Sequence, residues 1–386
     1  MLPHLKDFFS AHPFPASAFP HRLFSPGRIN IIGEHTDYTG GWVMPASIDK
    51  GIEFYARPIQ DDAMRLHAVD LGVHHDLPLP VTGKTGELWV DYLAGVIHEF
   101  QLLGHEVPAM EVVFGGNVPR GSGMSSSAAL EGGMAFLLNE VTGAGLSRAE
   151  LAVLSRRSSN NFIGVPTGIM DQFASLNGVA EGPIMLNCDT LEFTPVSANL
   201  PGYSWLLVNS MVTHELGSSE YPVRVRECAE ALAAVQQRFP EVTDLSAVTP
   251  EQLSATTESI APVVRKRARY VVEENQRVRA MAAALKAGDV ARAGALLNAT
   301  HRGLSKDYDV SCPEVDFLQA TATAFAEGRP LGSRIMGGGF GGCTINLVPD
   351  EIVEALKTAL TDAYEKEWGK TPEFYEVAIG AGTRLL

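Results

Sequence analysis

Residues 117–133 are NVPRGSGMSSSAALEGG, and they lie between a β-rich run at 109–114 and a helical pattern that starts near Ser125. Two glycines, three consecutive serines and a helix N-terminus therefore meet at one point. A phosphate group needs this combination, because glycines allow backbone N–H donors to approach closely and the helix dipole favours negative charge. A serine hydroxyl there can also ligate magnesium. An ordinary serine N-cap is the alternative, but three serines after two glycines favour a phosphate-binding loop.

A second polar cluster lies closer to the N-terminus, in residues 25–41, SPGRINIIGEHTDYTGG. Arg28 precedes an apolar run, and five hydrogen-bonding side chains follow that run: Glu34, His35, Thr36, Asp37 and Tyr38. Such a cluster at a strand end is costly to bury without partners. A polyol ligand would supply them, since carboxylates accept hydrogen bonds from sugar hydroxyls and a site built that way rejects an analogue lacking them. For this stretch alone, a solvated turn is an equal alternative.

A third block follows the phosphate-binding loop, in residues 165–178, VPTGIMDQFASLNG. Asp171 begins an amphipathic segment there, and its neighbours include Met170 and Phe173. Apolar neighbours desolvate a carboxylate in part, and its usefulness as a base then depends on what lies beside it. Taken alone, an acidic residue near a helix start is more often a favourable partner of the helix dipole.

Two other glycine-containing stretches resemble nucleotide motifs without fitting them. Gly83-Lys84-Thr85 looks like the end of a P-loop, but Pro78 stands where that motif needs its first glycine. The glycines of residues 337–342 satisfy GxGxxG, yet the following CTINLV is typical of a strand and not of the helix that a dinucleotide fold requires. Glycines between two strands more plausibly bring backbone close to a ligand or to another segment.

Composition bounds the class of protein. With 386 residues, of which 45% are hydrophobic, the chain can bury two cores. The formal net charge of −15 repels nucleic acids and anionic membrane surfaces, so we expect neither as a partner. The four cysteines are far apart in sequence and form no CxxC pair, which favours reduced thiols over a zinc site or a disulfide framework: Cys188, Cys228, Cys312 and Cys343.

The order of the expected elements predicts an α+β protein of two domains. Strands are expected at 29–33, 52–57, 64–70, 109–114, 182–187, 191–196, 203–209, around 337–342 and at 373–378. Helices are expected at 89–104, within 125–176, and at 219–238, 264–286, 288–303, 313–326 and 350–366. The best candidate for a junction is Pro201-Gly202, which divides the chain into domains of residues 1–200 and 201–386.

Taken together, the blocks resemble galactokinases of the GHMP small-molecule kinase superfamily. Residues 27–41 are similar to the galactokinase motif, residues 117–131 to the superfamily phosphate loop and residues 336–348 to its third motif; GIMDQFASL and SSEYPVR add two shorter matches. The motifs occur in the family's order over nearly the whole chain. The resemblance implies a two-domain GHMP kinase fold, with an N-terminal domain of ribosomal-protein-S5-like type, a ferredoxin-like C-terminal domain and the active site in the cleft between them.

The resemblance also implies an activity, the ATP- and magnesium-dependent phosphorylation of the anomeric hydroxyl of α-D-galactose, and a role for each matching position. Asp171 would be the catalytic carboxylate, with Arg28 beside it keeping it ionised. The sugar would be contacted by Glu34, His35, Thr36, Asp37, Gly168 and Tyr221. The ATP phosphates would be held by Gly121, Ser122, Gly123, Met124, Ser125, Ser126 and Ser127. Ser127 is the expected magnesium ligand, with Ser126 close behind.

One departure from the family pattern concerns the metal. Relatives usually have a magnesium-binding glutamate twelve positions before the catalytic aspartate, where this chain has Ser159. Magnesium would then be held by Ser127, the phosphates and water, with Ser159 as the weaker candidate ligand, and we expect weaker metal affinity. Two rival functions stay open: an N-acetylgalactosamine kinase, and a non-catalytic galactose sensor, against which the intact phosphate loop, Arg28 and Asp171 argue.

The sequence also bears on location. Lys6, Asp7 and several prolines stand where a signal peptide would need an unbroken apolar stretch, and no run is long enough to span a bilayer. We therefore expect a cytoplasmic protein, and a monomer, whose partners are the small molecules galactose and ATP.

Overall fold

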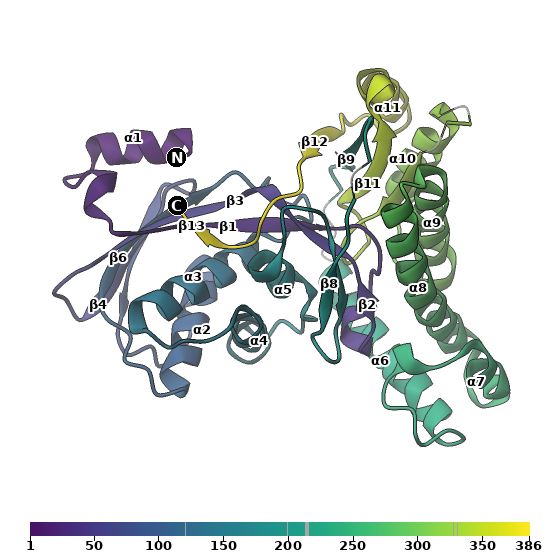
Figure 1. Ribbon diagram of the computed structural model, residues 1–386, viewed down its shortest axis with the longest axis horizontal. Coiled ribbons are helices and arrows are strands. Elements are labelled where there is room, and N and C mark those ends of the chain that lie inside the picture. Colours follow the sequence, from purple (N-terminus) through teal and green to yellow (C-terminus); the bar gives the residue numbers. More distant parts are fainter. Residues whose placement is uncertain (120, 199, 213–215, 327, 330) are drawn as a thin grey trace.

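The computed structural model describes residues 1–119, 121–198, 200–212, 216–326, 328–329 and 331–386; of Leu216–Ser219 and Thr257 it describes the backbone alone. Sheets and helices follow one another in mixed order along the chain (Figure 1), which confirms the expected α+β class. In the described part of the chain, no helix combines the length and the apolar character that crossing a membrane requires.

The largest sheet has six strands in the order β13-β1-β3-β6-β4-β5, and β4 runs parallel to β6. Its strands are β1 (His21–Asn30), β3 (Pro45–Pro58), β4 (Ala63–Ala68), β5 (Val73–Pro78), β6 (Met110–Gly116) and β13 (Arg384–Leu385). The pairing of β1 with β3 shifts register between Pro26 and Arg28. At this bulge, Gly27 has no room for a Cβ, which would lie 2.6 Å from the Met124 carbonyl oxygen. The sheet thereby delivers Arg28 directly to the loop at 121–127.

Four helices cover one face of this sheet: α2 (Leu88–Leu102), α3 (Ser126–Thr142), α4 (Arg148–Arg157) and α5 (Met170–Asn177). Phe54 and Val112 point toward them, whereas the alternate residues Tyr55 and Val113 pack against α1 (Pro3–Ala11) on the other face. Gly133 lets α3 lie close on the sheet, because a Cβ there would be 2.3 Å from the Phe54 ring. The face under α3 and α5 is the one that bears the catalytic candidates.

A second, antiparallel sheet has the order β10-β11-β9-β12. Its strands are β9 (Tyr203–Asn209), β10 (Gly332–Ile335), β11 (Cys343–Pro349) and β12 (Glu373–Val377). Leu206 and Val208 pack with α10 (Pro313–Phe325) and α11 (Val353–Trp368), whereas Leu207 packs with α8 (Pro262–Ala287) and α9 (Val290–Arg302). Helices therefore cover both faces of this sheet.

The remaining elements lie around and between the two large sheets. A small sheet is formed by β2 (Trp42–Val43), β7 (Ile184–Asn187) and β8 (Phe193–Pro195). The other helices are α6 (Leu216–Gln236) and α7 (Pro250–Ala255), π-helical turns at Ser158–Ile163 and Gly303–Tyr308, and short 3₁₀ turns at Ala16–Ala18, Asp37–Thr39, Leu245–Ala247, Thr257–Ser259 and Asp350–Ile352. One hydrophobic cluster joins Ile29 and Met44 to Leu207 and Val278, and β13 returns to pair with β1. The division at residues 200 and 201 accordingly stays a proposal.

Most of the expected elements are present, with shifted ends. The strand expected at 29–33 instead runs from His21 to Asn30, because residues 31–33 turn toward the second sheet, where Ile31 and Ile32 are buried in the shared cluster. No element was expected at α1, β2, β5, α7 or β13. These are short, and two of them lie at the ends of the chain, where local pattern is weakest.

Candidate active site

A paired guanidinium and carboxylate form the centre of the site. Arg28 donates from Nε to Oδ1 of Asp171 and from Nη2 to Oδ2, each at 2.7 Å. Arg28 is 4% exposed, whereas the side chain of Asp171 is 32% exposed. Burial alone would lower the pKa of Arg28, but the attraction of Asp171, Glu34 and Asp37 raises it above its ordinary value. The pair is thus a fixed cation holding a carboxylate that is still open to a ligand.

The loop before α3 contacts both members of this pair. Ser125 Oγ donates to Asp171 Oδ2 at 2.5 Å, and Arg28 Nη1 donates to the Gly123 carbonyl at 2.5 Å. Ser125 holds a left-handed conformation with φ of 55°, which is uncommon for a residue with a Cβ. This backbone turn directs the start of α3 at the space beside Asp171.

Glu34 is held by groups from the second sheet. Its Oε1 accepts from Nη1 of Arg334 at 3.0 Å and from the Gly337 N–H at 2.9 Å. Arg334 is fully buried and also donates to the carbonyls of Ile31, Ile335 and Asn30. The glycine cluster therefore does bring backbone against another segment, as expected, and that segment is the polar motif after β1.

His35 belongs to a buried chain of hydrogen bonds. Its Nε2 lies 3.2 Å from the Gly338 carbonyl, which can only accept, so the other ring nitrogen accepts from the Tyr38 hydroxyl at 2.8 Å. The chain continues from Tyr38 to the Tyr308 hydroxyl at 2.6 Å and to Cys228 Sγ at 3.1 Å. Burial lowers the pKa of His35 to about 4. His35 is therefore a neutral imidazole with a fixed orientation.

Asp37 lies against Gly168. A Cβ at Gly168 would be 1.7 Å from Asp37 Oδ2, so the position requires glycine. Burial, with the negative charges of Asp171 and Glu34, raises the pKa of Asp37 to about 7. Its carboxyl group therefore changes charge near neutral pH.

Two adjoining cavities meet at Arg28. The larger, of about 370 Å³, is lined by Arg28, Glu34, His35, Asp37, Gly164, Val165, Pro166, Thr167, Gly168, Met170, Asp171, Tyr221, Pro222, Gly337 and Gly338. The smaller, of about 250 Å³, is lined by Arg28, Val118, Pro119, Gly121, Ser122, Gly123, Met124, Ser125, Ser126, Ser127, Gly337 and Gly338. Three residues, Arg28, Gly337 and Gly338, are shared. A ligand in one cavity would thus lie next to a ligand in the other.

The structure brings every candidate to these two cavities except Thr36 and Ser159, among the residues it describes. The hydroxyl of Thr36 is buried and donates to the carbonyls of Gly33 and Trp42, at 2.9 and 2.8 Å. It therefore fixes the turn after β1 and is not offered to the larger cavity, which corrects the expectation of a direct sugar contact.

Ser159 is occupied in a different way. Its Oγ donates to Oε1 of Glu131 at 2.6 Å, and Gln172 donates to Oε2 at 3.2 Å. Burial raises the pKa of Glu131 to about 7. Glu131 is on α3, four residues after Ser127, so both side chains lie on the same face of the helix. The carboxylate near position 159 thus comes from Glu131, which corrects the view of Ser159 as a metal ligand.

Family models match three parts of the chain. Residues 91–179 match the one described as "GHMP kinases N terminal domain", residues 12–58 the "Galactokinase galactose-binding signature" and residues 281–366 "GHMP kinases C terminal". A galactokinase of Roseiflexus sp. is 38% identical over 372 residues, which is 96% of this chain and 94% of that protein. The chain belongs to the galactokinase family.

Other galactokinases and their structures agree with this. The galactokinase of Lactococcus lactis subsp. cremoris is 39% identical over 370 residues, covering 94% of this chain and 92% of its own. A crystal structure of Lactococcus lactis galactokinase complexed with galactose superposes with a TM-score of 0.92 at 36% identity, over 99% of both chains. A mevalonate kinase at 17% identity has a TM-score of 0.63, which shows the shared fold alone. The two-domain GHMP kinase fold expected from the sequence is therefore confirmed.

Three residues of this galactokinase-family site were missed from the sequence. Arg334 on β10 donates to Glu34, and Glu131 on α3 accepts from Ser159. Glu274 on α8 accepts from the Gly33 N–H at 2.9 Å. All three side chains are charged and fully buried. For Arg334 and Glu131, a charged residue within a mostly apolar stretch was the available signal, since such residues are buried only when paired. Glu274 stands among polar residues and gave no such signal.

Proposed function

We propose that this chain transfers the γ-phosphoryl group of ATP to the anomeric hydroxyl of α-D-galactose, giving galactose 1-phosphate and ADP. The observation that carries this proposal is the pair of cavities that share Arg28, with Asp171 at their junction. A sugar in the larger cavity and a triphosphate in the smaller would be adjacent, and positioning of this kind supplies much of the acceleration of phosphoryl transfer.

The larger cavity suits a hexose. Glu34 and Asp37 offer carboxylate oxygens, His35 a neutral ring held in one orientation, and Tyr221 a hydroxyl. Gly168 has no side chain, which leaves the space that the Asp37 carboxyl group occupies. Because Glu34 and His35 are already fixed by the second sheet, little ordering is needed when a sugar binds.

Asp171 and Arg28 are proposed as the catalytic residues. In the reaction, the oxygen of the anomeric hydroxyl forms a bond to the γ-phosphorus, the bond from that phosphorus to the β,γ-bridging oxygen breaks, and ADP leaves. Asp171 accepts the hydroxyl proton or the hydrogen bond that precedes its transfer. Arg28 holds both oxygens of Asp171 in place and would lie beside the phosphates, where its charge favours the developing negative charge. Gly121 through Ser127 supply backbone N–H groups to the phosphates.

The donor set also fits magnesium, which bound to ATP would neutralise phosphate charge during transfer. Ser127, in the first turn of α3, would hold it, with Ser126 next to it. We propose that Glu131 supplies the carboxylate that relatives have at position 159, because Ser159 is hydrogen-bonded to Glu131 at 2.6 Å. An unpartnered buried atom supports the fit: Oε1 of Gln172, whose amide bonds Glu131, has no hydrogen-bond partner among the described residues.

An ADP-release assay over a panel of acceptors tests the function. Galactose, N-acetylgalactosamine, glucose, mevalonate and homoserine should be compared at equal concentration, and galactose should give the highest rate. Faster turnover of N-acetylgalactosamine would make the chain a kinase of that sugar. Galactose binding without any ADP release would make it a sensor, and either result would refute the proposal.

The wider context is proposed on the same basis. We infer that the reaction takes place in the cytoplasm, where ATP is abundant; the four cysteines are buried and unpaired, which suits a reducing compartment. We also propose that the protein is a monomer that acts on two small molecules. Its domains are proposed to comprise residues 1–200 and 201–386. Gel filtration with light scattering would test the monomer.

A further inference from the structure

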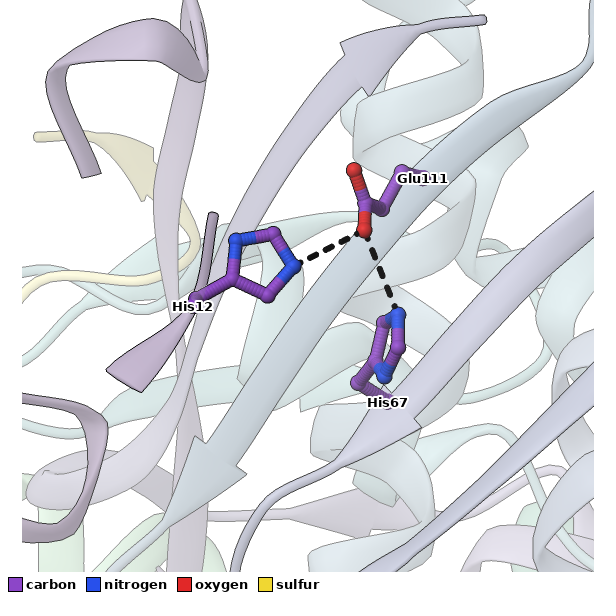
Figure 2. A group of neighbouring side chains, drawn as sticks. All are labelled: His12, His67 and Glu111. Carbon is purple, nitrogen blue, oxygen red and sulfur yellow. Dashed lines mark hydrogen bonds and ion pairs between the residues drawn. The ribbon is translucent and has the colours of Figure 1, made fainter. Parts of the chain in front are cut away.

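A second polar cluster lies on the face of the six-stranded sheet that α1 covers. It joins His12, directly after α1, to His67 on β4 and Glu111 on β6 (Figure 2). None of the three lines either cavity of the candidate active site. Glu111 shares this face with Val113, which packs against α1. The cluster is therefore separate from the kinase chemistry.

The spacing of the three side chains suits a metal ion. Nε2 of His12 lies 3.0 Å from Oε1 of Glu111, and Nε2 of His67 lies 3.3 Å from the same oxygen. All three atoms lie within 4.8 Å of one another. Ligand atoms around tetrahedral zinc, with bonds of ~2.0–2.1 Å, are roughly 3.3 Å apart. Figure 2 shows both ring nitrogens directed at the same carboxylate oxygen.

Hydrogen bonding accounts for only part of this arrangement. The contact of His12 with Glu111 is an acceptable hydrogen bond at 3.0 Å. Nε2 of His67, by contrast, is buried and makes no hydrogen bond of acceptable geometry with any described residue. A buried ring nitrogen without a partner costs free energy, and a metal ion between the three side chains would give it one.

Outer contacts already orient two of the three ligands. Nδ1 of His12 lies 3.0 Å from the Phe14 carbonyl and donates to it in the tautomer that leaves Nε2 free to bind a metal in the cluster. Arg57 donates to Oε2 of Glu111 at 2.6 Å, which leaves Oε1 for the cluster. Partners of this kind are typical around metal-binding histidines and carboxylates.

We propose that His12, His67 and Glu111 bind a divalent transition-metal ion, and that zinc is its natural occupant. Two imidazole nitrogens and one carboxylate oxygen match zinc and cobalt, whereas magnesium prefers oxygen ligands alone. The ion ties the segment after α1 to strands β4 and β6. A water molecule completes the tetrahedron, since the His67 side chain is 22% exposed. The charge of Arg57 opposes a cation, so binding is weaker than at a four-ligand structural zinc site.

Zinc uptake by the full chain, freed of any affinity tag and of metal, tests the proposal. Zinc is titrated in competition with a chromophoric chelator, and cobalt is titrated with the visible absorption spectrum as a readout of coordination. The wild-type chain should bind one equivalent of zinc more than His67→Ala. The zinc affinity of this site in the variant should be lower by about 100-fold or more. The matched control is His75→Ala. His75 lies on β5, in the same hairpin as His67, and is 3.2 Å from Glu87, but it has no third ligand among the described residues.

Two further measurements keep the test decisive. Should His67→Ala fail to fold, His12→Gln removes a ligand from a surface segment instead. Zinc should raise the melting temperature of the wild type and of His75→Ala, but not of either ligand variant. Asp171→Asn should keep the zinc equivalent, since it alters only the candidate active site. Equal zinc uptake by the wild type and by His67→Ala, or loss of the equivalent in Asp171→Asn, would overturn the proposal.

Discussion

Asp171 differs from an ordinary surface carboxylate in its three fixed donors. Two hydrogen bonds from Arg28 and one from Ser125 hold its oxygens, while part of the side chain stays open to the larger cavity. The group is therefore oriented before any ligand arrives, which is a requirement of efficient proton transfer.

We expect Asp171→Asn to lower kcat by about 10²–10⁴-fold, because an amide cannot accept the proton of the sugar hydroxyl. The fold and the ADP affinity should be retained, since Asn keeps the shape of the side chain. Steady-state kinetics and ADP titration calorimetry would measure both. Near-native turnover by this variant would show that the assigned chemistry is wrong.

Asp37 makes the stability of the ligand-free protein depend on pH. Its pKa is raised from 3.8 to about 7 in the folded chain, so between these values the folded state holds a proton that the unfolded state releases. The contribution to stability is therefore complete below pH 4 and is lost as the pH rises through 7. A carboxylate forced to ionise among Glu34 and Asp171 then destabilises the free protein.

Asp37→Asn should consequently stabilise the ligand-free protein at pH 8 by roughly 1–3 kcal/mol and leave it almost unchanged at pH 4, because the amide never ionises. The same substitution should weaken galactose binding much more than it weakens ATP binding. Chemical denaturation at the two pH values, with the exposed Asp70→Asn as the control, would measure the stability effect. Equal stabilisation at both pH values would contradict the assignment of the titration to Asp37.

The first two turns of helix α3 each contribute a side chain to the candidate metal site. Ser127 lines the smaller cavity, and Glu131 lies one turn further along the same face, hydrogen-bonded to Ser159 and Gln172. The family pattern has a glutamate at position 159, where this chain has Ser159, so Glu131 is the acidic group that hydrogen-bonds at this position. Fewer charged ligands give weaker metal binding.

Ser159→Glu should therefore raise magnesium affinity in the presence of ADP, by roughly tenfold, and Glu131→Gln should lower it by a similar factor. Displacement of Mn²⁺ followed by electron paramagnetic resonance would report binding directly. Ser159→Ala serves as the control, because it removes the hydroxyl without adding charge. An unchanged affinity in Glu131→Gln would exclude that carboxylate from the metal site.

Local pattern in the sequence was enough for the long helices, the buried strands and the three polar or glycine-rich blocks. It was insufficient for β13 and for Arg334, since strand pairing and charge pairing across some 300 positions leave no local periodicity. Thr36 shows the opposite error: it lies within the polar motif, but its hydroxyl is consumed by the turn. Motif membership locates a site, whereas hydrogen-bond partners decide which members face the ligand.

The two large sheets of the molecule are joined at the site itself. Arg334 on β10 donates to Glu34, Ile31 and Asn30, which follow or end β1, so one buried guanidinium spans both sheets. Its removal would leave the buried Glu34 carboxylate with the Gly337 N–H as its one hydrogen-bond donor among the described residues. Stability and sugar affinity are thus coupled through a single side chain.

Arg334→Met should cost about 3–5 kcal/mol of unfolding free energy, because breaking a buried ion pair strands the remaining charge. Arg329→Met is the matched control: its guanidinium is 47% exposed and 3.7 Å from Glu351, so its loss should be within ~1 kcal/mol. Adding Glu34→Gln to Arg334→Met should recover part of the loss. Denaturant titration would measure all three, and equal effects in the two arginine variants would contradict this account.

The pairing of β13 with β1 has a consequence for the order in which the protein can mature. Thr383 bonds Ser25 on the strand that bears Arg28, and also Ser175 on the helix that bears Asp171. In synthesis, residues 382–385 come after every other group of the site. A chain that ended before residue 382 would hold Arg28 and Asp171 but would lack the hydrogen bonds of Thr383 that join the strand bearing the first to the helix bearing the second.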